Sequence, residues 1–218
     1  MRPDWRDTVR VATDVALLGL LMVATSLPVV TTGAAFATAS YAVHTFLTDD
    51  RWPAPRACWH VFRRALLPGA LATAVVLTAA WLVTVDLTAV STGRVPGGAV
   101  VAGLTGVIAA AACGYAALAL VALGRGLSVA AANAHADPSA NAHSSPAAPA
   151  GAWRWAAKAA ASARPATVGA AAGVIGLAGL LAVLVHPILA ACLVGYALYA
   201  LHVVTRRLTP NAATQATP

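Results

Sequence analysis

Apolar residues run along this chain in long blocks separated by short polar segments, without the alternation of a strand or the narrow stripe of a surface helix. A helix needs about 20 apolar residues to cross the hydrocarbon core of a membrane. The pattern therefore predicts an all-α, polytopic membrane helix bundle of about six transmembrane helices, forming a single membrane domain over 1–218. The six candidate spans are 11–30, 33–47, 66–90, 98–123, 165–185 and 187–204.

The motif SLPVVTTGAA at 26–35 interrupts the first long apolar stretch. Pro28 has no backbone N–H, and its ring crowds the preceding turn, so a helix continues through it only at a cost in stability. We therefore expect one helix to end near Val30 and the next to begin near Gly33.

The start of this second helix combines capping residues with small ones. Thr31 and Thr32 are expected to cap it, because a threonine hydroxyl can accept a hydrogen bond from a free N–H group of the first turn. Gly33 and Ala37 have a spacing that lets two helix backbones approach closely in lipid, and 169–173 has the same spacing. The structural residues of the motif are Ser26, Pro28, Thr31, Thr32, Gly33 and Ala37.

Basic residues are concentrated in segments that would share one side of the membrane. Cytoplasmic loops are enriched in Lys and Arg. With six crossings and both termini cytoplasmic, thirteen of the fourteen Lys and Arg residues lie inside, and only Arg94 lies outside. The segment 33–47 would make a helix of about 22 Å, shorter than the hydrocarbon core of about 30 Å. It either crosses as a short, tilted helix or forms a re-entrant hairpin with the preceding span.

The composition excludes an ordinary soluble protein. The chain is 60% hydrophobic and 10% charged, with a mean hydropathy of +0.76, whereas soluble domains carry about 25% charged residues. The net charge of +7 would suit nucleic acid, but the basic residues lie in short segments between apolar runs, which fits membrane topology better. We expect a multi-pass protein of the cell (plasma) membrane, surrounded by the lipid bilayer and without a nucleic-acid partner.

The segment 52–66 has the composition of a helix that lies in the inner membrane interface. Aromatic anchors and basic residues share it, as in amphipathic helices at the headgroup level. Its face either anchors the chain in lipid or docks a cytoplasmic partner. The residues that would do so are Trp59, Phe62, Arg63 and Arg64.

Two polar segments are expected to lack regular structure. Residues 127–151 are predicted to be a disordered cytoplasmic loop, since their Ala, Ser, Pro and Asn residues offer little apolar surface to bury. The end of the chain, 208–218, is predicted to be a flexible tail. His135 and His143 in the loop lack the cysteine or carboxylate cluster of a metal site, so no metal is expected.

Ionisable residues in or near the spans are candidates for function, because they are costly in lipid. Asp14 is expected near His202 and Arg206 at the inner side, and Asp86 near His186 at the outer side. All five lie near helix ends, where snorkelling lowers the cost. Structural pairing therefore competes with a polar pathway as the role of these residues.

Motifs of common enzyme classes do not occur in the sequence. It holds no GxxxxGK[ST] phosphate loop, no HExxH zinc motif and no GxSxG nucleophile elbow. We therefore predict no catalytic residues and no cofactor, and we expect the protein not to be an enzyme. A membrane-embedded enzyme with sparse motifs is a minor alternative.

The SLPVVTTGAA motif, with the apolar span before it and Ala39 and Tyr41 after it, resembles the signature of the YesL-like family of small bacterial integral membrane proteins, a domain of unknown function. The segment WHVFRR at 59–64 is also similar to the segment that follows the motif in that family, whereas Thr32 replaces the usual aliphatic residue. The resemblance covers residues 1–90. It implies a small multi-span protein of the kind often encoded beside carbohydrate ABC-importer components, with no established activity.

Together, these features predict a non-enzymatic multi-span membrane protein that is accessory or regulatory to a solute importer of the carbohydrate type. Its partners would be ABC-importer subunits, and a homo-oligomer is also open. The alternative is a small secondary transporter or channel, in which the broken helix at Pro28–Gly33 offers backbone groups to a solute, as broken helices do in transporters.

Overall fold

The computed structural model describes residues 5–92, 98–136, 149–184 and 187–208. Within these ranges all regular structure is helical, which confirms the predicted all-α class. The elements follow in chain order as α1 (Trp5–Thr25), the 3-10 turn η1 (Val29–Thr31), α2 (Thr32–Asp49), α3 (Pro55–Ser91), α4 (Gly98–Ala136), α5 (Pro149–Ala161), α6 (Pro165–Leu184) and α7 (Pro187–Leu208).

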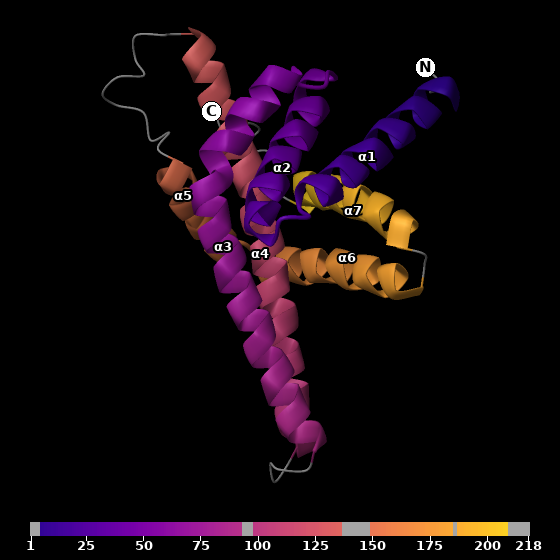
Figure 1. The fold of residues 1–218 in the computed structure, drawn as a ribbon, viewed down its shortest axis with the longest axis vertical. Coiled ribbons are helices and arrows are strands. Elements are labelled where there is room, and N and C mark those ends of the chain that lie inside the picture. Colours follow the sequence, from indigo (N-terminus) through magenta and orange to yellow (C-terminus); the bar gives the residue numbers. More distant parts are fainter. Residues whose placement is uncertain (1–4, 93–97, 137–148, 185–186, 209–218) are drawn as a thin grey trace, which may run out of the picture.

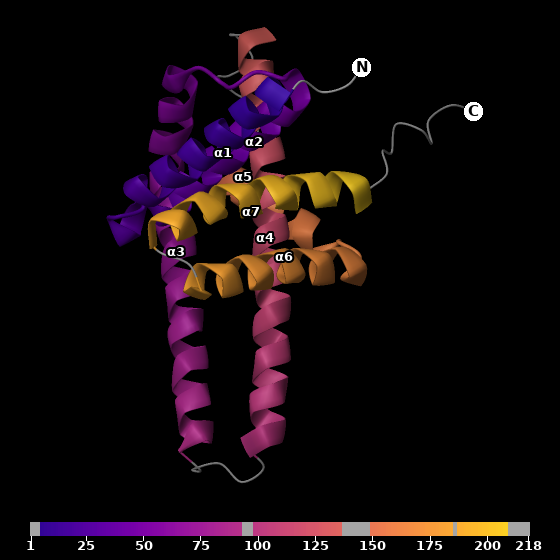
Figure 2. The ribbon, with the colours of Figure 1, turned by 90° about the vertical axis from the view of Figure 1, so that its right-hand side faces the viewer.

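Two long antiparallel helices, α3 and α4, run the whole length of the molecule (Figure 1). They contain 37 and 39 residues, which corresponds to about 55 and 58 Å at 1.5 Å per residue. The first part of α3 and the last part of α4 pack with the other helices. Their remaining parts extend beyond the rest of the protein as a hairpin (Figure 2).

The helices α6 and α7 form a second hairpin that lies crosswise to α3 and α4, with α1 beside α7 (Figure 2). The six predicted spans therefore do not share one direction in this arrangement. Three helices in the described part of the chain are long and apolar enough to cross a membrane, namely α3, α4 and α6. This supports a helical, membrane-embedded protein.

The predicted interfacial segment and the predicted disordered loop both differ from the structure. The interfacial segment 52–66 and the span 66–90 are not separate, because α3 continues through Pro68 without interruption. The loop predicted to be disordered at 127–151 is helical at both ends, in α4 up to Ala136 and in α5 from Pro149. Alanine is abundant there, and its high helix propensity favours continuing a helix. The middle of that loop and the tail from 209 onward lie outside the described residues.

The predicted break between the first two helices is present. α1 ends at Thr25, earlier than the expected Val30. Pro28 has an extended backbone (φ −75°, ψ 109°) and precedes η1, after which α2 begins at Thr32. The chain thus turns back within a few residues, and α2 runs beside α3 rather than continuing α1 (Figure 1).

The two threonines of the break do not cap α2, contrary to the prediction. Their hydroxyl groups instead donate to carbonyl oxygens at the end of α1 and in the turn. Thr31 Oγ1 donates to the carbonyls of Thr25 and of Pro28, the latter at 2.7 Å, and Thr32 Oγ1 lies 3.5 Å from the carbonyl of Ser26. They satisfy carbonyls that a helix leaves free at its C-terminus.

The cap of α2 comes from α3. The Gly33 N–H donates to Thr73 Oγ1 at 2.9 Å, and Thr73 Oγ1 in turn donates to the Gly69 carbonyl at 2.9 Å. Gly33 and Gly69 bring the two backbones into contact. A Cβ on Gly69 would lie 2.6 Å from the Ala34 nitrogen, and a Cβ on Gly33 would strike the Gly69 carbonyl. The close approach expected at Gly33 is thus present, and Ala37, one turn on, is 0% exposed.

Glycine also lies at other helix crossings in the described chain. Gly19 and Gly195 bring α1 against α7, and Gly114 brings α4 against Val168 of α6. The spacing at 169–173 is not used in this way, since nothing lies within 4 Å of a Cβ built on either glycine of that segment.

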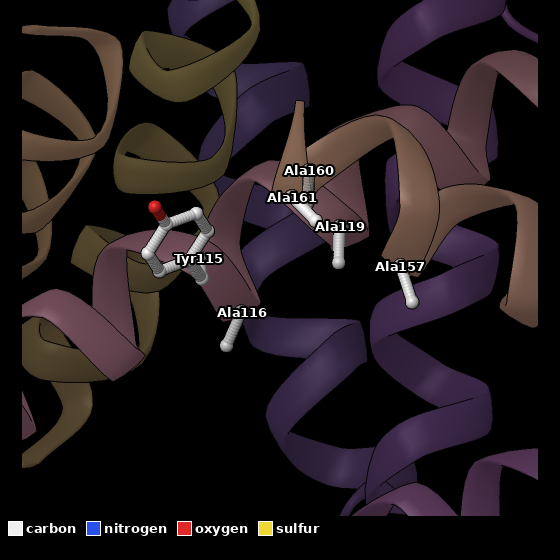
Figure 3. Close-up of a pocket in the computed structure, with 6 residues that line it drawn as sticks. All are labelled: Tyr115, Ala116, Ala119, Ala157, Ala160 and Ala161. Atoms are coloured by element: carbon white, nitrogen blue, oxygen red, sulfur yellow. The ribbon is translucent and has the colours of Figure 1, made fainter. Parts of the chain in front are cut away.

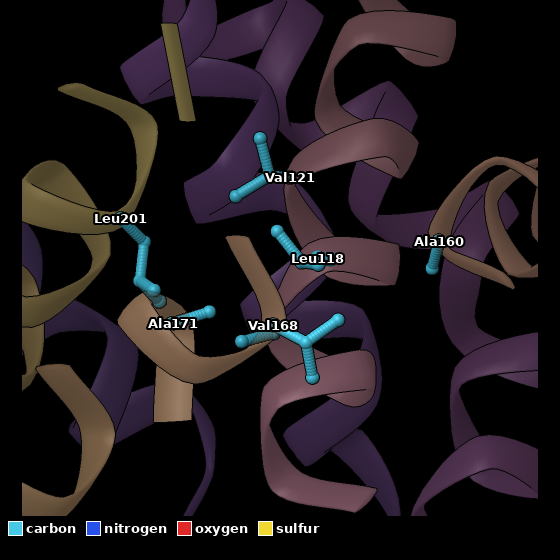
Figure 4. Close-up of a cluster of buried hydrophobic side chains, with 7 residues drawn as sticks. Leu118, Val121, Ala160, Val168, Ala171 and Leu201 are labelled. Carbon is cyan, nitrogen blue, oxygen red and sulfur yellow. The ribbon is translucent and has the colours of Figure 1, made fainter. Parts of the chain in front are cut away.

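Small and branched apolar side chains fill the junction of α4, α5, α6 and α7 (Figure 4). None of them exceeds 8% exposure. Three of the seven members are alanines, whose small side chains let the helices pack at short range. The members of this cluster are Ala117, Leu118, Val121, Ala160, Val168, Ala171 and Leu201.

Replacing Gly33 by alanine is expected to lower the free energy of unfolding by about 1–3 kcal/mol, because the added methyl group forces the backbones of α2 and α3 apart. The measurement is SDS-induced unfolding in mixed micelles, followed by helical circular dichroism. Gly106→Ala is the matched control, because nothing lies within 4 Å of its Cβ position. Equal effects of the two substitutions would contradict the contact with Gly69.

Candidate functional site

A buried polar cluster joins α2, α4 and α7 within the packed half of the protein. Its centre is Ser40 on α2 and His202 on α7, which are 0% and 1% exposed. Ser40 Oγ donates to the Leu120 carbonyl of α4 at 2.7 Å and lies 3.3 Å from His202 Nε2. His202 Nδ1 lies 3.0 Å from the Leu198 carbonyl. Three helices are therefore linked through one hydroxyl and one imidazole.

The hydrogen-bond partners define the protonation of the His202 ring. A carbonyl oxygen can only accept, so Nδ1–H donates to Leu198, and Nε2 of the neutral ring is an acceptor. The Ser40 hydroxyl consequently faces two acceptors, the Leu120 carbonyl and Nε2. Because unsatisfied polar groups are costly in a low-dielectric interior, this shared hydrogen is important for holding the helices together.

Ser40 beside a histidine base is a pairing that can support nucleophilic catalysis. Here the backbone of α4 covers the hydroxyl, since a Cβ on Gly124 would strike Ser40 Oγ and would lie 2.7 Å from the Ser40 carbonyl oxygen. No substrate can reach Ser40 Oγ in this packing. The pair therefore fastens helices together.

A second layer of polar groups lies beside this pair. The rings of His44 and His202 are 6.4 Å apart between centroids, in an edge-on arrangement. His44 Nδ1 lies 3.1 Å from Ser128 Oγ on α4, and Ser128 Oγ donates to the Arg125 carbonyl at 2.8 Å. Arg206 Nη1 donates to the carbonyl of Leu47 at 2.7 Å, which ties the end of α7 to α2.

Asp14 and Asp86 each accept a hydrogen bond from a residue that the sequence did not single out. Asp14 Oδ2 accepts a hydrogen bond from Trp52 Nε1 at 3.1 Å, so the expected group of Asp14 with His202 is not formed. Asp86 Oδ2 accepts from Thr105 Oγ1 at 2.6 Å, across the α3–α4 hairpin. His186, its expected neighbour, lies outside the described residues.

The predicted docking residues lie near the start of α3. Trp59, Arg63 and Arg64 are exposed there. Phe62 is half-buried: it stacks on Trp59 with 5.7 Å between ring centroids and also packs against the buried cores around α2. Phe62 therefore anchors the helix, and the outward face is carried by the other three side chains.

An open cleft of about 440 Å³ lies between α4 and α5 (Figure 3). Its wall is almost wholly alanine, with one aromatic ring at the edge, so it offers no convergent set of polar or catalytic groups. The residues that line it are Tyr115, Ala116, Ala119, Ala157, Ala160 and Ala161. In the described ranges, no three His, Cys, Asp or Glu side chains are grouped so as to hold a metal ion.

Comparisons with known proteins give no relative. No protein-family model matches the chain, no curated protein matches it, and no solved structure matches its fold.

Sequence reasoning singled out His202 of the cluster but not Ser40 or Ser128. The sequence feature that could have pointed to Ser40 and Ser128 is that each is a hydroxyl residue in or near a predicted membrane helix. Hydroxyls are common in membrane helices because they can bond to their own backbone, as Thr78 does at 2.9 Å to the Ala74 carbonyl. Only the packing shows which hydroxyl joins two helices.

Ser40→Ala is expected to lower the free energy of unfolding by about 1–3 kcal/mol, because it leaves His202 Nε2 buried without a donor and removes the hydrogen bond that joins α2 to the Leu120 carbonyl of α4. SDS-induced unfolding measures the change. Thr78→Val is the control, since that exposed hydroxyl bonds only within its own helix. A double-mutant cycle with His202→Gln should give a coupling energy different from zero, and strict additivity would refute the Ser40–His202 interaction.

Proposed function

We propose that this protein is a non-enzymatic plasma-membrane protein that acts by binding another membrane protein, as an accessory or regulatory subunit of a solute importer. The observation that carries the proposal is the projecting part of the α3–α4 hairpin. Most of its exposed side chains are apolar, and it extends away from the other helices (Figure 2). The choice of an importer as the partner, and of carbohydrate as its solute, rests only on the resemblance of the 26–35 motif to the YesL-like family.

The surface of the hairpin suits contact with another transmembrane helix. Large apolar side chains on both helices point outward, and Gly103 and Gly106 of α4 have nothing within 4 Å of a built Cβ. Small residues on an apolar helix allow a second helix to approach its backbone closely. The exposed large side chains of the hairpin are Leu71, Val75, Val76, Leu77, Trp81, Leu82, Val85, Leu87, Val100, Leu104, Val107 and Ile108.

The transporter alternative has less support. It requires backbone or hydroxyl groups of the broken helix to be available to a solute. In the described break, Thr31, Thr32 and the Gly33 N–H already have partners within the chain. The Gly33 contact is likewise occupied by Gly69, so neither a solute nor a partner helix can use it without displacing α3.

The charge distribution supports a hairpin inserted from the cytoplasmic side. Arg56, Arg63, Arg64 and Arg125 lie on the parts of α3 and α4 remote from the hairpin tip, and basic residues favour the cytoplasmic face. Cytoplasmic termini fit the same distribution. A six-span topology would further require α6 and α7 to tilt toward the direction of α3 and α4.

Site-specific photo-crosslinking in cells tests the proposal. A photoreactive residue at Val107 of the hairpin is expected to crosslink to an importer permease or its ATPase, while the same residue at Leu180, an exposed position on α6, is not. Gly106→Leu should weaken association by about 1–3 kcal/mol through overpacking. Gly169→Leu, equally open in the structure, should leave it unchanged.

Crosslinks that join Val107 only to a second copy of this chain would replace the accessory role by a homo-oligomer. If Val107 crosslinks only to lipid, the exposed hairpin no longer supports a protein partner. In either case solute flux in proteoliposomes, with Thr31→Val as the variant, becomes the test of the transporter alternative.

A further inference from the structure

Two arginines and a histidine from three helices gather where α2, α4 and α7 meet. Arg206 is held over the end of α2 by its bond to the Leu47 carbonyl. Ser128 links His44 to the turn of α4 that carries Arg125, because its hydroxyl lies 3.1 Å from His44 Nδ1 and 2.8 Å from the Arg125 carbonyl. We call Arg125, Arg206 and His44 the cationic cluster.

The two arginines of this cluster act on each other and on His44. Arg206 lies within electrostatic range of Arg125, and both arginines lie within range of His44. Among the described residues, the carboxylate that acts on His44 is Asp49, which is not among the groups that act on Arg125. Two like charges brought together near lipid raise the free energy of the protein unless an anion joins them.

Arg125 is the member of the cluster whose charged group most needs an external hydrogen-bond acceptor. It is half-buried, and no described residue accepts a hydrogen bond from its guanidinium group or forms an ion pair with it. No buried side-chain nitrogen or oxygen among the described residues lacks a hydrogen-bond partner. The guanidinium nitrogens of Arg125 are therefore reachable from the surface, so an external acceptor can bind them.

We propose that the cationic cluster binds one phosphate group, presented by the headgroup of an anionic phospholipid. A guanidinium fork matches the geometry of phosphate oxygens and binds them in bidentate fashion. The cluster lies on the half of the molecule that carries the basic residues, and the inner leaflet is the one rich in anionic lipids. The phosphate would sit between α4 and α7 and so stabilise the junction that Ser40 and His202 form inside the protein.

This inference requires a membrane-embedded protein but not the accessory role. The test reconstitutes the full chain in vesicles of mixed phosphatidylglycerol and phosphatidylcholine, extracts it in mild detergent, and measures retained lipid by mass spectrometry. The wild type is expected to retain phosphatidylglycerol selectively. Arg125→Gln/Arg206→Gln should lower that enrichment by at least about tenfold, the loss of one charge-assisted hydrogen bond.

Arg154→Gln/Arg164→Gln is the matched control, since it removes the same number of charges from exposed positions on α5 and just before α6 and should keep the enrichment. If the double variant of the cluster does not fold, Arg206→Gln alone and Arg125→Lys replace it. The first removes an exposed charge, and the second keeps the charge but loses the fork. Both should weaken retention.

Inorganic phosphate separates the two sources of the ligand. Displacement of phosphatidylglycerol by phosphate, in the wild type only, supports recognition of the phosphate group. Binding of inorganic phosphate by a protein that retains no phosphatidylglycerol overturns the lipid as its source. The proposed site is refuted if both double variants lose the same amount of phosphatidylglycerol, or if the wild type does not retain this lipid selectively.

Discussion

Contact between helix backbones at glycine is the constraint on which the packed half of this protein depends. Lipid is as apolar as the side chains, so hydrophobicity does little to hold membrane helices against one another, and close packing and hydrogen bonds do so instead. Three of the crossings described above combine these two interactions. Gly33 and Gly69 meet beside the Thr73 hydroxyl, Gly124 meets Ser40 itself, and near Gly19 the Tyr196 hydroxyl donates to the Ala12 carbonyl at 2.8 Å.

The two halves of the molecule differ in this respect. The packed half holds both the glycine contacts and the hydroxyl–carbonyl bonds that join helices. In the projecting half, α3 and α4 are joined by the hydrogen bond that Thr105 donates to Asp86. Helices that share so few contacts have a low local stability of association. This contrast is why the hairpin, and not the broken helix, is the surface from which a partner is proposed.

Local chemistry in the sequence was enough to predict the helical class, the break at Pro28 and the close approach at Gly33. It was not enough to identify Gly69 and Thr73 as the groups that meet Gly33, because the rotation of one helix against another depends on packing across 40 positions of chain. The same reason explains why Asp14 has Trp52 as its partner. The segment 127–136 was predicted to be disordered from its polarity, but alanine propensity and continuity with α4 make it helical.

The lengths of α3 and α4 have a mechanical consequence. A membrane core of about 30 Å covers little more than half of a helix of about 55 Å, so a helix of this length that crosses it upright continues for about 25 Å beyond the hydrocarbon. α4 contains no proline, and it passes from the hairpin into the packed half as one continuous rod. Because α4 is continuous, the hairpin and the packed half move together. A tilt of the hairpin in the bilayer, imposed by a neighbouring protein or by membrane thickness, would rotate the packed half through the same angle.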